Sequence, residues 1–231
     1  MSRVQSDPAL TEQVLGSGRQ PETCGVPIPS RPSWAEVIKR LMDLACAIFG
    51  LILLSPVFLI VAALVKAQDG ESILYRRRVV GRSGTFDAFK FRTMTPDADA
   101  LLHASPSMRE RFEENFKLKG DPRVTRIGAF LRKLSLDELP QLFNVLVGQM
   151  SLVGPRMITV QELEKYGDYA PLLLSVRPGL TGYWQVNGRQ NVGYSHRVEM
   201  DVYYIQHWSL KLDLSILLRT PWKVLKREGA F

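Results

Sequence analysis

Two adjacent carboxylates lie among basic residues in the middle of the chain. Asp137 and Glu138 follow Arg132, and Arg156 comes a short distance later in Gly154-Pro155-Arg156. Carboxylates beside arginines suit phosphoryl transfer, because a carboxylate can act as a nucleophile or hold Mg²⁺ while guanidinium groups bind phosphate oxygens. The pattern makes Asp137 and Glu138 candidates for catalysis and Arg132 and Arg156 candidates for phosphate binding.

The same fragment also has a purely structural interpretation. Ser135-Leu136-Asp137-Glu138 matches the capping-box pattern S-x-x-E before an apolar run, in which Asp137 would only complement a helix dipole. However, Pro140 would remove an early hydrogen bond of a helix that began at Ser135. A helix start nearer Leu139-Pro140, with the acidic pair in the preceding turn, stays open beside the capping box.

Further basic residues lie in two other places. Lys90 and Arg92 belong to a basic and aromatic stretch, 75–94, which suits phosphates, lipid head groups or single-stranded nucleic acid, or forms a solvated hairpin. Arg177 and Arg189 lie in the glycine-rich loops 177–182 and 186–189, and a requirement of the backbone alone is sufficient to explain these glycines. The three histidines lack the spacing of metal ligands, which disfavours zinc.

These residues follow an apolar segment that suits a membrane. Residues 44–65 carry no charge, with Lys39, Arg40 and Asp43 before them and Lys66 after them. Ser55-Pro56 lies at the midpoint, and Pro56 cannot donate to the Ile52 carbonyl, so we expect a bend there. Proline is tolerated in spanning helices, whereas basic residues on both sides are typical of a hairpin, so a kinked spanning helix and a re-entrant hairpin both stay open.

The remaining chain predicts a mixed α/β fold. Residues 73–80 and 85–92 pattern as a strand hairpin, and 97–117 as a helix interrupted near Ser105-Pro106. Short amphipathic helices are expected over 123–134 and 136–147. The last segment, 210–224, is either a helix at a membrane interface or a core-packing terminal helix. Residues 1–33 have the composition of a disordered or loosely attached tail.

Composition sets broad limits on function. The chain has 231 residues, a formal net charge of +7 and two cysteines, Cys24 and Cys46, which are poorly placed to pair. The positive charge predicts attraction to nucleic acid, anionic lipid or phosphorylated substrates. The cysteine pattern fits a reducing compartment, and the N-terminus has no apolar stretch typical of a cleavable signal.

Several segments, in order and spacing, resemble the monotopic phosphoglycosyl transferases that begin bacterial polysaccharide synthesis. They are KRLMD (39–43), the Ser55-Pro56 break, FKFRTM (89–94), DPRVTRIGAFLRKLSLDELPQLFNV (121–145), MSLVGPR (150–156), RPGLTGYWQVNGR (177–189) and MDVYYIQHWSLKLDL (200–214). The similarity covers nearly everything from Lys39 onward. Gln149 and Met157 depart from the family's usual pattern.

The resemblance implies a specific chemistry and topology. Asp137 matches the family's nucleophile and metal-binding carboxylate, Glu138 its partner, and Arg132 and Arg156 match arginines associated with phosphate. It implies Mg²⁺, a UDP-sugar and undecaprenyl phosphate as substrates, and a re-entrant helix over 34–66 hinged at Ser55 and Pro56. A cytoplasmic catalytic domain would follow over 67–231.

We therefore expect an enzyme at the cytoplasmic face of the bacterial inner membrane, with both termini in the cytoplasm and amphipathic helices at the membrane surface. Its partners would include membrane lipid and no nucleic acid. The alternative is a membrane-anchored basic adaptor that binds acidic lipid or nucleic acid without catalysis. The acidic pair argues against it, because a polyanion-binding surface has no use for Asp137 and Glu138.

Overall fold

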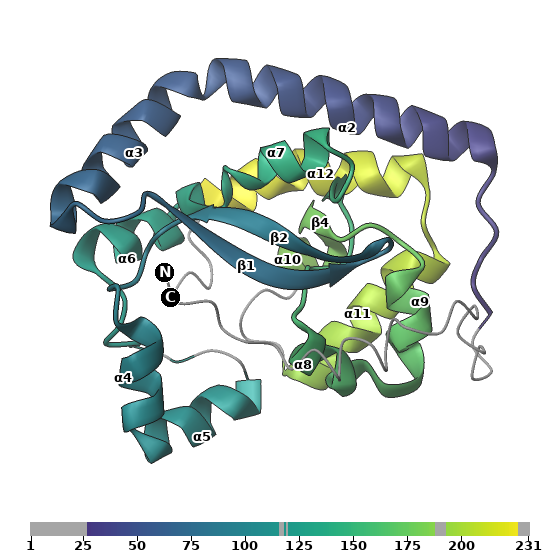
Figure 1. The fold of residues 1–231 in the computed structure, drawn as a ribbon. Coiled ribbons are helices and arrows are strands. Elements are labelled where there is room, and N and C mark those ends of the chain that lie inside the picture. The colour runs from purple at the N-terminus through teal and green to yellow at the C-terminus, as the bar shows by residue number, and fades with distance from the viewer. Residues whose placement is uncertain (1–26, 116–117, 119, 188–192, 226–231) are drawn as a thin grey trace.

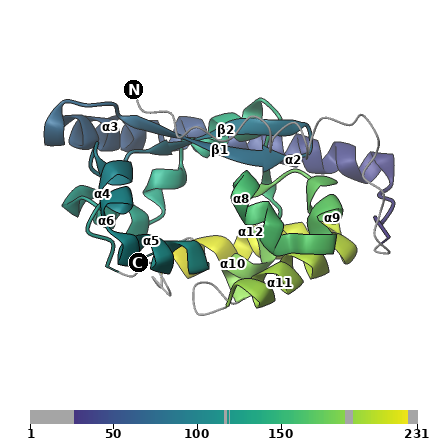
Figure 2. The ribbon, with the colours of Figure 1, turned by 60° about the horizontal axis from the view of Figure 1, so that its bottom comes forward.

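The chain folds into a mixed α/β structure in which small sheets are surrounded by helices (Figure 1). The structure is a computed structural model, and it describes residues 27–115, 118, 120–187 and 193–225. In Figure 2, helices α2 and α3 and the hairpin β1–β2 lie along one side of the molecule, while α10, α11 and α12 lie on the other. The acidic pair lies between α6 and α7.

The apolar segment forms two helices that meet at a bend. Helix α2 (Ser33–Leu53) and helix α3 (Ser55–Asp69) are inclined by 62°, which confirms the predicted break. Pro56 cannot donate to the Ile52 carbonyl, and the Ser55 hydroxyl donates to that carbonyl instead, at 2.8 Å. Within the described residues no single helix is long and apolar enough to cross a membrane, whereas the bent pair passes the same test together.

Polar side chains near the start of α2 hold this helix to the rest of the fold. The Lys39 ammonium donates to the Asp213 carboxylate at 2.6 Å and to the Val153 carbonyl at 2.9 Å. Arg40 donates to the Val145 and Leu146 carbonyls, at 2.7 and 2.9 Å. Buried Asp43 accepts from the Leu152 main chain at 2.9 Å. The charges that precede the apolar segment are thus structural anchors.

A hairpin follows, as predicted. Strand β1 (Leu74–Gly81) pairs antiparallel with β2 (Gly84–Phe91), and this register places Lys90 opposite Tyr75. Phe91 joins a small apolar cluster with Val61 and Val65 of α3 and Leu131 of α6, so the hairpin packs against the second arm of the bent pair.

The next helices are short. Helices α4 (Ala98–Ala104) and α5 (Pro106–Asn115) are separated at Ser105, which confirms the predicted interruption. Helix α6 (Arg126–Lys133) begins after Thr125, whose hydroxyl accepts from the Gly128 main chain at 2.9 Å. The expected single helix over 136–147 is wrong: a 3₁₀ turn, η1 (Leu136–Glu138), precedes α7 (Gln141–Leu146), because Pro140 prevents one continuous helix.

The second half of the chain builds the main core. Strands β3 (Ser151–Val153) and β4 (Gly179–Thr181) pair in parallel. Around them lie α8 (Val160–Leu163), η2 (Glu164–Tyr169), α9 (Ala170–Leu174), α10 (Tyr183–Asn187), α11 (Tyr194–Gln206) and α12 (Leu210–Leu225). Buried side chains such as Met150, Ile158 and Ile205 fill the space between these elements.

Helix α12 shows features of both interpretations of the C-terminal segment. Its Asp213 and Ile216 are buried and face β3 and β4, as in a core helix. Its Leu214, Leu218 and Trp222 are exposed, as in an interfacial helix. The amphipathic pattern thus positions one face of α12 against the core and leaves an apolar face uncovered.

Candidate active site

The acidic pair lies in the turn between α6 and α7. Ser135 has a left-handed backbone conformation, with φ of 54°, and its side chain makes no capping hydrogen bond. The capping box is therefore wrong, and the alternative that placed the acidic pair in the turn before the helix is confirmed. This geometry leaves both carboxylates free for contacts with other parts of the chain.

Glu138 is bound by two cations from distant parts of the sequence. Its Oε1 accepts from the Lys90 ammonium at 2.7 Å and from Arg156 Nη2 at 3.0 Å. Burial alone would raise the pKa of Glu138, but Lys90 and Arg156 outweigh it and lower that pKa to about 2. Burial also lowers the pKa of Lys90. Glu138 is thus ionised and holds Lys90 and Arg156 beside the turn.

Asp137 has different surroundings. Its side chain is buried, and no described residue donates a hydrogen bond to it. Burial raises the pKa of Asp137, and Glu138 adds to this, while Lys90, Arg132 and Arg156 act in the opposite direction. A carboxylate that is unbonded and surrounded by cations has the properties of a nucleophile.

Arg132 completes the cluster from α6. Its Nε donates to the Thr93 hydroxyl at 2.9 Å, which fixes the guanidinium on the side of Asp137. Helix α6 can approach Thr93 because Gly128 has no side chain: a Cβ there would lie 2.0 Å from the Thr93 carbonyl oxygen. Thr93 was not among the predicted site residues, although it follows Lys90 and Arg92 closely in FKFRTM.

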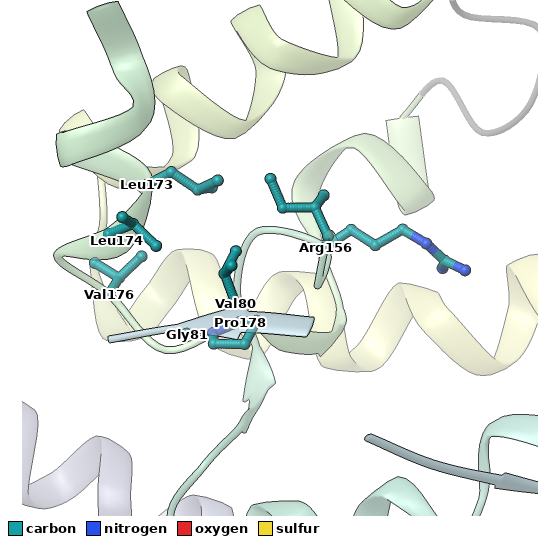
Figure 3. A pocket seen from close by; sticks show the side chains of 8 residues that line it. Val80, Gly81, Arg156, Leu173, Leu174, Val176 and Pro178 are labelled. Atoms are coloured by element: carbon teal, nitrogen blue, oxygen red, sulfur yellow. The ribbon is translucent and has the colours of Figure 1, made fainter. Parts of the chain in front are cut away.

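The glycines of two loops hold the backbone of Arg156 in place. A Cβ on Gly179 would lie 2.1 Å from the Gly154 nitrogen, and one on Gly182 would lie 2.4 Å from the Gly154 carbonyl oxygen. The backbone interpretation of the loop 177–182 is therefore confirmed. In Figure 3, Arg156 lines a small apolar pocket, and its guanidinium points away from Val80 and Leu173.

A buried polar network at Asp201 and Tyr166 lies near Arg156, and sequence reasoning missed it. The carboxylate of Asp201 on α11 accepts from the Tyr166 hydroxyl at 2.8 Å. Burial raises the pKa of Asp201 to about 6, although Arg197 and the nearby Arg156 oppose the shift. The signal was available: Asp201 lies on the inner face of α11 with Val198, Tyr204 and Ile205, where a charge needs a partner.

The structure brings together Lys90, Arg132, Asp137, Glu138 and Arg156, and places the other candidates elsewhere. Arg92 donates to both carboxylate oxygens of Asp69 at the end of α3. Arg177 donates through Nε to the Gly148 carbonyl at 2.9 Å and lines a different pocket. Arg189 lies outside the described residues. Ser55 and Pro56 are at the bend, far along the chain from the cluster.

The carboxylate arrangement fits Mg²⁺ better than a metal that needs a full protein cage. Among the described residues no group of three His, Cys, Asp or Glu side chains is arranged to hold a metal ion. Mg²⁺ is commonly bound through one or two carboxylates together with water and substrate phosphates. The unbonded carboxylate of Asp137 can serve as such a ligand.

Comparisons with known proteins identify the family. A family model described as bacterial sugar transferase matches residues 34–227. The chain is 48% identical to the exopolysaccharide production protein ExoY of Sinorhizobium fredii, over 84% of this chain and 88% of the relative. It is 46% identical to an undecaprenyl-phosphate galactose phosphotransferase of Salmonella typhimurium, over 85% of this chain and 42% of the relative.

A third relative is more distant. The chain is 38% identical to a UDP-glucose:undecaprenyl-phosphate glucose-1-phosphate transferase of Klebsiella pneumoniae, over 84% of this chain and 42% of the relative. The chain thus spans less than half the length of several of the curated relatives it matches. Because one family model accounts for residues 34–227 and the ExoY protein is matched over most of both chains, this protein belongs to the bacterial sugar transferase family.

Proposed function

We propose that the protein transfers a sugar 1-phosphate from a UDP-sugar to undecaprenyl phosphate and releases UMP. The observation that carries this proposal is the cluster at η1, where the unbonded carboxylate of Asp137 lies beside Lys90, Arg132 and Arg156. Relatives named for transfer of galactose and of glucose to undecaprenyl phosphate support the acceptor. Because those names differ in the sugar, the proposal extends only to a UDP-sugar donor.

The first step uses Asp137 as the nucleophile. A carboxylate oxygen attacks the β-phosphorus of the UDP-sugar, the bond from that phosphorus to the bridging oxygen breaks, and UMP leaves with the bond's electrons. The product is an acyl phosphate that joins the sugar phosphate to Asp137. This step needs an ionised carboxylate, and the three nearby cations oppose the effect of burial on its pKa.

The second step regenerates the enzyme. A phosphate oxygen of the lipid attacks the same phosphorus, and the acyl phosphate bond breaks to return the Asp137 carboxylate. Lys90, Arg132 and Arg156 would stabilise the charge on the phosphoryl oxygens in both steps, and Glu138 would hold Lys90 and Arg156 in position. Bound Mg²⁺ would supply further neutralisation of the phosphate oxygens, with Asp137 as its protein ligand.

The proposal includes the position of the protein in the cell. The bent pair α2–α3 would be a re-entrant segment over 34–66 that enters and leaves one face of the inner membrane. The domain over 67–231 and both termini would then be in the cytoplasm, where UDP-sugars are made. Exposed apolar side chains on both arms support this, among them Phe49 and Ile52 on α2 and Leu59 on α3.

The test is a single-turnover experiment on detergent-solubilised protein. UDP-sugars are added one at a time without lipid, and we expect UMP release with a sugar-phosphate mass adduct on the peptide that contains Asp137. Undecaprenyl phosphate added afterwards should remove the adduct. Asp137→Asn should abolish both the adduct and turnover. Turnover that requires lipid before any UMP appears, with no adduct, would instead favour direct transfer in a ternary complex.

A further inference from the structure

A second basic pocket lies apart from the acidic pair, between the start of α2 and the loops around β3 and β4. Its charged lining residues are Arg31, Glu36, Lys39, Arg82 and Arg177. None of them contacts Glu138, whose cations are Lys90 and Arg156. Four cations and one carboxylate give the lining a clear positive excess, which favours an anionic ligand.

The cations in this pocket differ in how far their charge is already compensated. Lys39 is bound to Asp213, which lies just behind the lining. Arg177 uses its Nε on the Gly148 carbonyl. Arg82 is half-exposed at the rim, and its nitrogen is 3.9 Å from the Glu36 carboxylate, too far for a good hydrogen bond. Guanidinium groups at the rim thus retain donors for a ligand.

Arg31 provides the most specific sign of a ligand. Its Nη2 is buried and has no hydrogen-bond partner among the described residues. Burial lowers the pKa of Arg31, and Arg82 adds to this effect, while Tyr204, Asp213 and Glu36 oppose it. The guanidinium carbon lies 4.5 Å from the centre of the Trp208 ring, so stacking fixes its orientation. A buried donor without a partner is unfavourable, and an anion would satisfy it.

We propose that this pocket binds the phosphate of an anionic phospholipid head group. Guanidinium groups are well suited to phosphate, because their planar donors match its oxygens. The opposite side of α2 favours a lipid over free phosphate: Trp34, Val37 and Leu41 are exposed and apolar there, about half a helical turn from the pocket-lining Glu36 and Lys39. Acyl chains of a lipid whose phosphate occupies the pocket would pass beside α2 to reach this surface, and tryptophan is typical of a membrane interface.

The inference rests on the membrane association proposed above and concerns a pocket whose charged lining residues are separate from the cations bound to Glu138. Its occupant would be a structural lipid that fixes the first arm of the bent pair against the domain. A variant that loses the site should therefore lose affinity for anionic lipid whether or not the protein proves to be a transferase.

The experiment measures thermal unfolding of the full chain in a neutral detergent with short-chain lipids added. Dihexanoyl phosphatidylglycerol should raise the unfolding temperature in a saturable way. Dihexanoyl phosphatidylcholine and inorganic phosphate at the same concentrations should have much smaller effects. In the double variant Arg31→Gln/Arg82→Gln, the apparent Kd for phosphatidylglycerol should rise about tenfold or more, as two charge-assisted hydrogen bonds are lost.

The matched control is Arg78→Gln, which also removes a charge from the hairpin but lies away from the pocket and pairs with Asp87 at 3.2 Å. It should bind phosphatidylglycerol as the wild type does. Equal loss in Arg78→Gln, or no loss in the double variant, would overturn the site. Equal stabilisation by phosphatidylcholine would exclude selectivity for a head group with net negative charge and overturn the proposal. Equal stabilisation by inorganic phosphate would replace the lipid by a soluble phosphate. None of these readouts uses a UDP-sugar, so they are independent of the proposed activity.

Discussion

Asp137 and Glu138 are adjacent in sequence, yet their surroundings shift their pKa values in opposite directions. Glu138 is ion-paired with Lys90 and Arg156, and its pKa falls to about 2. Asp137 is buried without a hydrogen bond from a described residue, and its pKa rises. Such divergence is typical of carboxylates that have separate roles in one site. It supports the proposal that Asp137 is the reactive group and that Glu138 positions the cations.

The contrast predicts opposite effects on stability. Glu138 is ionised in the folded protein at pH values where the unfolded chain, with a pKa near 4.5, binds protons, so its contribution is present above that value and is lost as pH falls toward about 2. Asp137 has a raised folded pKa, so its ionisation opposes folding as pH rises through that value.

At neutral pH, Glu138→Gln leaves buried Lys90 unpaired and should destabilise the protein by about 3 kcal/mol. Asp137→Asn removes an unfavourable buried charge, so its unfolding temperature should equal or exceed that of the wild type. Thermal unfolding of both variants without substrate checks this. A large loss of stability in Asp137→Asn would mean that the carboxylate is a structural ion-pair partner and would weaken its assignment as nucleophile.

For Arg156, the effect of the guanidinium geometry can be tested separately from the effect of the positive charge. Arg156→Lys keeps the charge but loses the planar donors that can contact Glu138 and a phosphate together. We expect turnover to fall about 100-fold, because small errors in the position of a phosphate-binding group cost about that much. Steady-state UMP release measures it, with Arg78→Lys as the control. Near-normal turnover would remove Arg156 from the site.

At the scale of elements, the position of Arg156 depends on contact between two glycine loops. Gly179→Ala would place a Cβ 2.1 Å from the Gly154 nitrogen, a clash of backbone against side chain that cannot be relieved by a rotamer change. We expect a loss of stability of about 2 to 4 kcal/mol, as for other severe steric changes in a packed interior, together with low activity.

Gly193→Ala is the matched control for this prediction. Gly193 precedes α11 with φ of −59°, and a Cβ there would meet nothing within 4 Å. Its stability should change by less than about 0.5 kcal/mol, as at an ordinary surface position. Thermal unfolding and UMP release of the two variants give the comparison, and equal behaviour would show that the glycine contact does not control Arg156.

Local patterns predicted those elements whose boundaries are fixed by local chemistry. The hairpin 73–92, the bend at Ser55-Pro56 and the interruption at Ser105 all depend on strand alternation or proline. Two local signals disagree at Asp137. The capping-box pattern favours a helix that starts at Ser135, whereas Pro140 favours a later start. In the structure Ser135 has a left-handed conformation and the helix starts after the acidic pair.

The sequence predicted site residues only where the charge of the side chain was a sufficient signal of a role in the site. Lys90 and Arg92 are two apart on one stretch, and alternation would place both on the same face. Lys90 lies within β2 and reaches Glu138, but Arg92 lies beyond the strand end and pairs with Asp69. Asp201 and Thr93 act through contacts between distant segments, which no local pattern specifies.

At the scale of the whole molecule, apolar surface and positive charge occur together. The formal net charge is +7, and both arms of the bent pair and α12 carry exposed large apolar side chains, such as Leu59 and Leu218. A protein with this combination is suited to a membrane interface, because the apolar groups enter the acyl region while cations meet anionic head groups. The property to test at this scale is therefore the membrane topology of the bent pair.

The re-entrant arrangement predicts that both ends of the bent pair are on the cytoplasmic side. Two single-cysteine proteins test it in intact cells with a membrane-impermeant thiol reagent: one keeps Cys24, with Cys46 changed to Ala, and the other carries Ser72→Cys with both native cysteines changed to Ala. Both should be protected from the reagent and should react after the cells are lysed.

The bend depends on Pro56, so Pro56→Ala in the same backgrounds should restore a donor to the Ile52 carbonyl and favour a straight, spanning helix. In that variant one of the two cysteines should become reactive in intact cells, whereas Ser55→Ala, which removes only a hydroxyl, should leave both protected. Labelling of one cysteine in the unmodified helix would contradict the re-entrant proposal and place the two flanks on opposite sides of the membrane.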